Sequence, residues 1–218
     1  MKSHAYVLQE TDLEVGDVLL CYSSLVQSNF GEIEEVTGSA YSHAGISVGE
    51  NMIAEAADGG VRISAVAELL EEYDHIAVFR NPFVWSPDRQ TAVIKFINDA
   101  VASSAGFNRF GMWRYEVRRG EYTETMTARL EDFFAGKLAP ISTRRSIYFC
   151  SEFIAAAFID VGIIHQSAGV VLTPEIMAPA DLALDPVYGW FQGYVVRDVN
   201  YEIPEDDDFF NETPIELV

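Results

Sequence analysis

The first eighty residues alternate short apolar segments with turn-forming residues, and this pattern constrains the fold more than any other feature of the chain. Each segment is four to six residues long, apolar or β-branched, and bounded by Gly, Asn or Asp, which is typical of strands in an antiparallel sheet. We expect strands over Asp17–Tyr22, Ala44–Val48, Met52–Ala56, Val61–Ser64 and Ile76–Arg80, with a short helix over Ala65–Glu72.

The middle of the chain changes to a helical period. Ser86 and Pro87 form a typical helix start, because Ser is a favoured N-cap and Pro fits the first helical position. Further helices are expected over Thr127–Phe134 and Phe149–Val161, and a last strand over Trp190–Arg197. Strands followed by helices and a closing strand predict an α+β fold, since alternating βαβ units would interleave the two.

The charge is strongly acidic and unevenly distributed. The chain has 34 Asp and Glu against 14 Lys and Arg, a net charge of −20, which excludes a protein that binds nucleic acid through clustered cations. No internal repeat is present, so we predict one domain over residues 1–197. Residues 198–218 hold eight acidic residues and no cation, and we predict an acidic C-terminal tail that could bind a protein partner.

No segment is apolar enough to cross a membrane. The longest uninterrupted apolar run, Phe153–Ile159, has seven residues, whereas a spanning helix needs about 20. The N-terminus also lacks the apolar core of a signal peptide. We therefore expect no transmembrane segment and a cytoplasmic location.

Two cysteines, Cys21 and Cys150, are too few for a disulfide scaffold and lack the spacing of a metal site. Cys21 ends an apolar strand and is expected in the core. Cys150 lies in the first turn of a predicted helix, where the helix dipole stabilises a thiolate, and on the apolar face of that helix. A buried structural thiol and a nucleophile both fit this position.

A thiol nucleophile needs a base that is itself oriented by a third group. His43 is the histidine best placed for this role, because it lies at the start of a predicted strand. The other three have no ligand partner at metal spacing, and His75 and His165 are expected in loops. If residues 49–51 form a three-residue hairpin turn, Gly45 faces Glu55, and Glu55 lies on the same face as His43, one diagonal step away. A two-residue turn would turn Glu55 to the other face, so the register decides whether Glu55 can orient His43.

An ordered series of motifs resembles a known family. The motifs are Leu13-Glu14-Val15-Gly16-Asp17-Val18-Leu19, Tyr41-Ser42-His43-Ala44-Gly45-Ile46, Ala54-Glu55-Ala56, Val78-Phe79-Arg80 and Tyr148-Phe149-Cys150-Ser151-Glu152-Phe153. In order and spacing they are similar to the YiiX-like, circularly permuted branch of the NlpC-type papain-like cysteine peptidases and amidases. The resemblance spans about residues 13–197.

The resemblance implies a permuted papain-like fold, in which a small antiparallel, barrel-like sheet packs against helices that include the nucleophile helix. It implies that Cys150 is the nucleophile, His43 the base and Glu55 the residue that orients the base. We also predict that Tyr41 and Tyr148 line the substrate site. The implied chemistry is cleavage of a peptide-like amide through a thioester on Cys150, without metal or cofactor; a cell-wall fragment is one candidate substrate.

Two alternatives remain open at this point. The same thiol could act on an ester, as in lipid acyltransferases and phospholipases related to lecithin:retinol acyltransferase, which predicts an apolar patch and attraction to membranes. A non-catalytic binding protein on the same scaffold is the other alternative.

Overall fold

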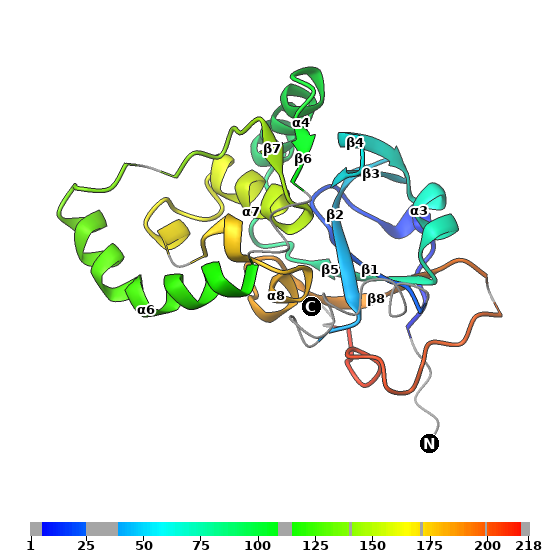
Figure 1. Ribbon diagram of the computed structural model, residues 1–218. Helices are drawn as coiled ribbons and strands as arrows, with labels where there is room; N and C mark the ends of the chain where they lie inside the picture. The colour runs from blue at the N-terminus through cyan, green and yellow to red at the C-terminus, as the bar shows by residue number, and fades with distance from the viewer. Residues whose placement is uncertain are drawn as a thin grey trace. The chain divides into compact units, whose positions relative to one another are not determined.

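The computed structural model describes residues 6–24, 39–108, 115–139, 141–170, 172–198 and 200–214 (Figure 1). By its internal contacts the chain divides into two compact units, which we describe one at a time. The first unit comprises Met1–Glu55, Ile63–Trp85 and Pro179–Val218, and the second comprises Ala56–Arg62 and Ser86–Ala178. The described part of residues 198–218 belongs to the first unit, and a catalytic domain over 1–197 with a separate tail stays a prediction.

A six-stranded antiparallel sheet with the strand order β4-β3-β2-β1-β5-β8 makes up most of the first unit, except for residues 56–62 at the end of β3 and the start of β4, which belong to the second. Its strands are β1 (Val18–Tyr22), β2 (Tyr41–Gly49), β3 (Met52–Ala57), β4 (Gly60–Ala65), β5 (His75–Arg80) and β8 (Trp190–Val196). The segment before the short helix η1 (Glu10–Asp12) extends the edge at β8, where the Leu8 N–H donates to the Tyr194 carbonyl over 2.7 Å. This segment covers backbone groups that an edge strand would otherwise expose.

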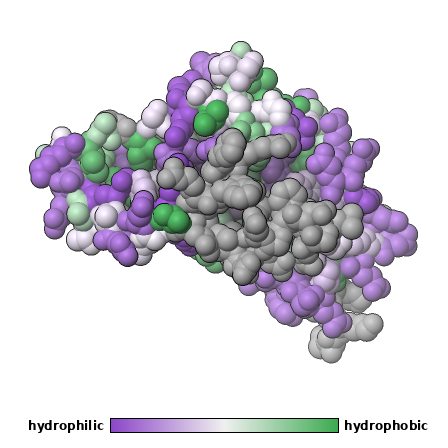
Figure 2. All heavy atoms as spheres, in the orientation of Figure 1, coloured by the Kyte–Doolittle hydropathy of each residue, from purple (hydrophilic) through white to green (hydrophobic). Residues whose placement is uncertain are grey.

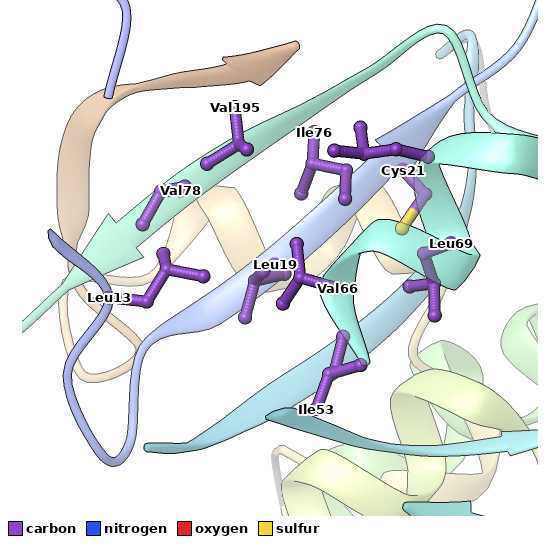
Figure 3. Close-up of a cluster of buried hydrophobic side chains, with 10 residues drawn as sticks. Leu13, Leu19, Cys21, Ile53, Val66, Leu69, Ile76, Val78 and Val195 are labelled. Atoms are coloured by element: carbon purple, nitrogen blue, oxygen red, sulfur yellow. The ribbon is translucent and has the colours of Figure 1, made fainter. Parts of the chain in front are cut away.

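The core of the first unit lies between one face of this sheet and helix α3 (Val66–Glu72). Alternate residues of β1 and β5 point to this face, and α3 packs Val66 and Leu69 against them (Figure 3). The cluster includes Leu19, Cys21, Ile53, Ile76, Val78 and Val195. Cys21 is fully buried in it, which confirms the prediction that this thiol belongs to the core.

The second unit is mainly helical. It contains α4 (Pro87–Ala102), α6 (Tyr115–Phe134), α7 (Cys150–Asp160), the short helices η2 (Ala168–Val170) and η3 (Pro174–Ile176), and the parallel pair β6 (Gly106–Phe107) and β7 (Ile147–Tyr148). Helix α4 begins as predicted, with the Ser86 hydroxyl accepting a hydrogen bond from the Arg89 N–H over 3.3 Å. Helix α7 packs against α4 and η3, and its residues 150–159 are all buried.

These elements confirm the α+β class, while the circular permutation and the barrel-like closure stay predictions. Helix α6 is longer than the predicted Thr127–Phe134, and α8 (Pro179–Leu184), which contacts β1 and β2, was not predicted. In the described part of the chain, no helix combines the length and apolar character that a bilayer-spanning segment requires.

Large apolar side chains also reach the surface. On the coloured part of the face in Figure 2, hydrophobic residues form small groups between hydrophilic ones. Val117 and Phe134 on α6 are 62% and 76% exposed, and Phe83 and Leu184 in the first unit are 74% and 78% exposed. Apolar side chains scattered in this way are ordinary for a protein surface.

Candidate functional site

The hairpin of β2 and β3 determines which side chain lies near His43. Gly45 pairs with Glu55, as predicted, but the turn has two residues rather than three. Glu50 and Asn51 occupy it with φ of 54° and 59°, the left-handed conformation that tight two-residue hairpins require. A bulge at Val48 adds one residue to β2 and restores the pairing of Gly45 with Glu55. The predicted turn was therefore wrong, whereas the register derived from it is confirmed.

His43 and Glu55 form a buried hydrogen-bonded pair. The distance from His43 Nε2 to Glu55 Oε2 is 2.5 Å, and the two side chains are 8% and 2% exposed. The Ser64 hydroxyl donates to Glu55 Oε1 over 3.4 Å, and the Tyr73 ring stacks on the imidazole at 5.6 Å between ring centroids and 8° between planes. The imidazole is thus oriented by a carboxylate on one edge and by an aromatic ring on one face.

Tyr41 lies on the opposite face of the sheet from His43. His43 pairs with Cys21 and Tyr41 pairs with Tyr22, with a bulge between the two pairs. Paired side chains share a face and successive residues of a strand alternate, so the bulge separates two side chains that simple alternation would place together. Tyr41 is fully buried, and its predicted role in substrate binding would require a site on that other face.

The Tyr41 hydroxyl belongs to a buried network around Asp207. Tyr41 and Tyr194 donate to the Asp207 carboxylate over 2.9 and 2.5 Å, and His75 Nε2 lies 3.0 Å from it. His75 Nδ1 lies 3.1 Å from the Tyr201 hydroxyl. Burial raises the pKa of Asp207, but the hydrogen bonds from His75 and Tyr194 outweigh it and hold the pKa below its usual range.

This network corrects the prediction for His75. His75 is the first residue of β5 rather than part of a loop, and its side chain is fully buried. Two neighbouring acidic residues, Asp207 and Asp208, form hydrogen bonds within the first unit. Asp208 accepts its bond from the Ser39 hydroxyl over 2.8 Å. A protein partner for the acidic tail stays a prediction, and these two carboxylates already have partners.

Cys150 is the first residue of α7, close to the predicted start at Phe149. The helix is buried on all sides rather than on one face, and the Cys150 side chain is buried, with 2% of the residue exposed. The Phe149 ring stacks on Phe107 of β6 at 6.3 Å between centroids. The thiol therefore sits at the N-terminal end of a helix whose entry is held by packing.

Glu152, two residues after Cys150, holds the same helix end. Its Oε2 accepts a hydrogen bond from the Phe149 N–H over 3.0 Å, and its Oε1 accepts one from Arg145 Nη1 over 2.6 Å. Arg145 also pairs with Glu175 of η3. Burial raises the pKa of Glu152, against the opposing effects of the Phe149 N–H and Arg145. Sequence reasoning assigned no role to Glu152, although its place three residues after the N-cap is typical of helix capping.

The Tyr148 hydroxyl forms hydrogen bonds with two backbone groups of the second unit, to which Tyr148 itself belongs. It donates to the Thr143 carbonyl over 2.8 Å and accepts a hydrogen bond from the Arg145 N–H over 2.7 Å. The ring is buried among Phe96 and Phe153, and burial raises the pKa of the hydroxyl. The predicted role of Tyr148 in lining the substrate site stays a prediction, and its hydroxyl proton is already used by Thr143.

Within the described ranges, no three His, Cys, Asp or Glu side chains lie close enough together to hold a metal ion. That the chemistry needs neither metal nor cofactor follows from the thiol mechanism and stays a prediction.

Comparison with known proteins finds a distant relative. The chain is similar to the probable lipoprotein peptidase YaeF of Escherichia coli (strain K12), with 29% identity over 161 residues. The match covers 69% of this chain and 57% of YaeF, so the chain spans little more than half of that relative's length. No family model matches the sequence, and no solved structure matches it. The relative supports the resemblance to peptidases seen in the motifs, and its name leaves the cytoplasmic location a prediction.

Proposed function

We propose that the protein is a cysteine hydrolase that cleaves a peptide-like amide bond, with Cys150 as the nucleophile, His43 as the base and Glu55 as the residue that orients His43. The observation that carries the proposal is the buried 2.5 Å hydrogen bond between His43 and Glu55. A nucleophile of this kind needs a base that is itself held by a third group. The hairpin supplies such a pair, and helix α7 supplies a thiol at its first residue.

The proposed reaction runs through a thioester. Glu55 holds Nε2 of His43, so Nδ1 is the nitrogen that exchanges a proton with the Cys150 thiol. The thiolate attacks the amide carbon, forming a C–S bond, and the C–N bond breaks as the imidazolium gives its proton to the leaving amine. Water then attacks the thioester while His43 takes its proton, which releases the carboxylic acid and restores the thiol.

The start of α7 can stabilise the oxyanion of each tetrahedral intermediate. Backbone N–H groups in the first turn of a helix have no partner within the helix and point toward an anion at its N-terminus. We assign the Cys150 N–H as one donor, since it belongs to the first residue of α7. Loss of one such donor typically costs about 100- to 1,000-fold in rate.

An amide substrate is favoured over an ester by the relative named as a probable peptidase. We therefore expect the protein to hydrolyse peptide-like amides, and a series of amides and esters with matched acyl groups would compare the two substrate classes directly. A preference for long-chain esters would contradict the amidase proposal and favour the alternative of a lipid acyltransferase or phospholipase.

The first test is alkylation of the folded protein by iodoacetamide, followed by mass spectrometry of both cysteines. We expect Cys150 to react much faster than Cys21 at pH 6, and His43→Ala to move the pH profile of Cys150 toward that of an ordinary thiol, with a midpoint at about pH 8.5. A Cys150 that stays inert up to pH 9, with no effect of His43→Ala, would contradict the proposal and favour the binding-protein alternative.

A further inference from the structure

Glu152 is a buried carboxylate that the proposed reaction does not use, and it lies two residues after the proposed nucleophile. Glu152 is 2% exposed and is the third residue of α7, which begins at Cys150. A buried carboxylate at this place has two physical consequences: it can hold the helix end, and it adds a negative charge to the helix turn that carries a group which must itself become negative.

The contacts that hold the start of α7 link three segments in series: α7 itself, the segment that carries Arg145, and η3. Glu152 Oε2 accepts from the N–H of Phe149, the residue directly before the nucleophile, and Oε1 accepts from Arg145. Arg145 is 33% exposed at its side chain and is held in turn by Glu175 of η3. The backbone that carries Cys150 is therefore tied on its N-terminal side to a side chain that is itself fixed by an ion pair.

The charges around Glu152 come from every segment that packs against it. Arg145 and Glu175 contact the carboxylate or its partner, Arg118 of α6 acts on it electrostatically, and the Tyr148 ring lies close enough to be affected by its charge. The two cations and two carboxylates sum to zero, so with Glu152 ionised the two arginines add no net positive charge to that of the helix dipole at the start of α7.

We propose that Glu152 is a positioning residue that fixes the start of the nucleophile helix and, through its charge, limits how readily Cys150 ionises without His43. The inference rests on the proposed function, because it takes Cys150 as the reactive thiol. It makes Cys150 reactivity depend on the imidazolium of His43 rather than on the helix end alone.

Glu152→Gln separates the two roles. Glutamine also serves at this capping position, so its amide oxygen can keep the bond to Phe149 while the charge is lost. Removing a negative charge from the helix turn that carries the thiol favours the thiolate. We expect the alkylation profile of Cys150 to move down by about 0.5–1 pH unit, which makes alkylation at pH 6 about three- to tenfold faster. Glu152→Ala, which also removes the capping bond, is expected to lower the melting temperature as well.

Asp160→Asn is the matched control. Asp160 is the last residue of the same helix and is also paired with an arginine, Arg144. It lies ten positions after Cys150, about 15 Å along a helix, which exceeds the Debye length of about 10 Å at 0.1 M salt. We expect this variant to leave the profile unchanged.

The outcomes distinguish the inference from the proposed function. If wild-type Cys150 is reactive and Glu152→Gln leaves its profile in place or moves it upward in a folded protein, the inference is wrong and the proposed function stands. If wild-type Cys150 is inert up to pH 9, the proposed function fails and the inference with it. An equal shift in Asp160→Asn would mean that net charge, rather than the position of Glu152, controls the thiol.

Discussion

Glu55→Gln tests whether the carboxylate beside His43 supports an imidazolium. Glu55 bonds to His43 Nε2 at 2.5 Å in a buried site, so glutamine can keep an acceptor oxygen there but loses the negative charge. A hydrogen bond to a charged group contributes about 1.5–3 kcal/mol and a neutral one about 0.5–1.5 kcal/mol. The imidazolium therefore loses about 1–2 kcal/mol of stabilisation, which lowers its population by about 5- to 30-fold, and in the proposed mechanism the population of the Cys150 thiolate falls with it.

The assay is the rate of iodoacetamide alkylation at Cys150 between pH 5 and 7, measured with the melting temperature of each variant. Asp17→Asn is the matched control, because Asp17 is an equally buried carboxylate of the same unit, paired with Arg80 instead of a histidine. We expect it to reduce stability without changing the alkylation profile. A folded Glu55→Gln protein with the wild-type profile would refute the reasoning, since the pair would then hold the hairpin without acting on the thiol.

Three further variants test contacts that stabilise each unit internally, two in the first unit and one in the second. Asp207→Asn should lower the free energy of unfolding by about 2–4 kcal/mol at pH 7, because a buried pair with His75 is broken. The folded pKa of Asp207 lies below the unfolded value of about 3.9. The stability that Asp207 contributes is therefore present above about pH 3.9 and is lost as pH falls through the folded pKa. Urea unfolding curves of wild type and Asp207→Asn should converge on acidification. Arg80→Met should cost about 3–5 kcal/mol by leaving the Asp17 carboxylate buried without its bidentate partner, and adding Asp17→Asn should recover part of that loss in the same measurement. Ser86→Ala should cost about 1 kcal/mol by removing the cap of α4, and a cost near zero would show that this helix start is held by packing instead.

The sequence was most informative where a local rule determines the structure. Strand period, a Ser-Pro helix start and the pairing of Gly45 with Glu55 all depend on residues close together in the chain, and the structure agrees with them. The same hairpin shows the limit of such rules. A two-residue turn and a bulge at Val48 together produce the register that a three-residue turn would give alone, and the spacing of apolar residues cannot distinguish the two.

Bulges also explain why the position of Tyr41 could not be predicted. A bulge between the pairs of His43 and Tyr41 reverses the face of every residue on its far side, so an error of one residue turns a neighbour of the base into a residue of the opposite face. Nothing in the residue types of this strand marks the bulge, and the Tyr41 side chain is stabilised there by Asp207, 166 residues later in the chain.

The contacts of His43 and those of Glu152 differ in the same way. The partner of His43 is 12 residues away across one hairpin, so its identity follows from strand pairing. The partners that surround Glu152 come from different segments: Arg145 lies seven residues before it, and the Glu175 that holds Arg145 lies 30 residues beyond that arginine. No periodic pattern links those three positions, because an irregular segment and a short helix bring them together. Motifs thus identify the groups proposed to react, whereas the charged partners of Glu152 become visible only in the folded chain.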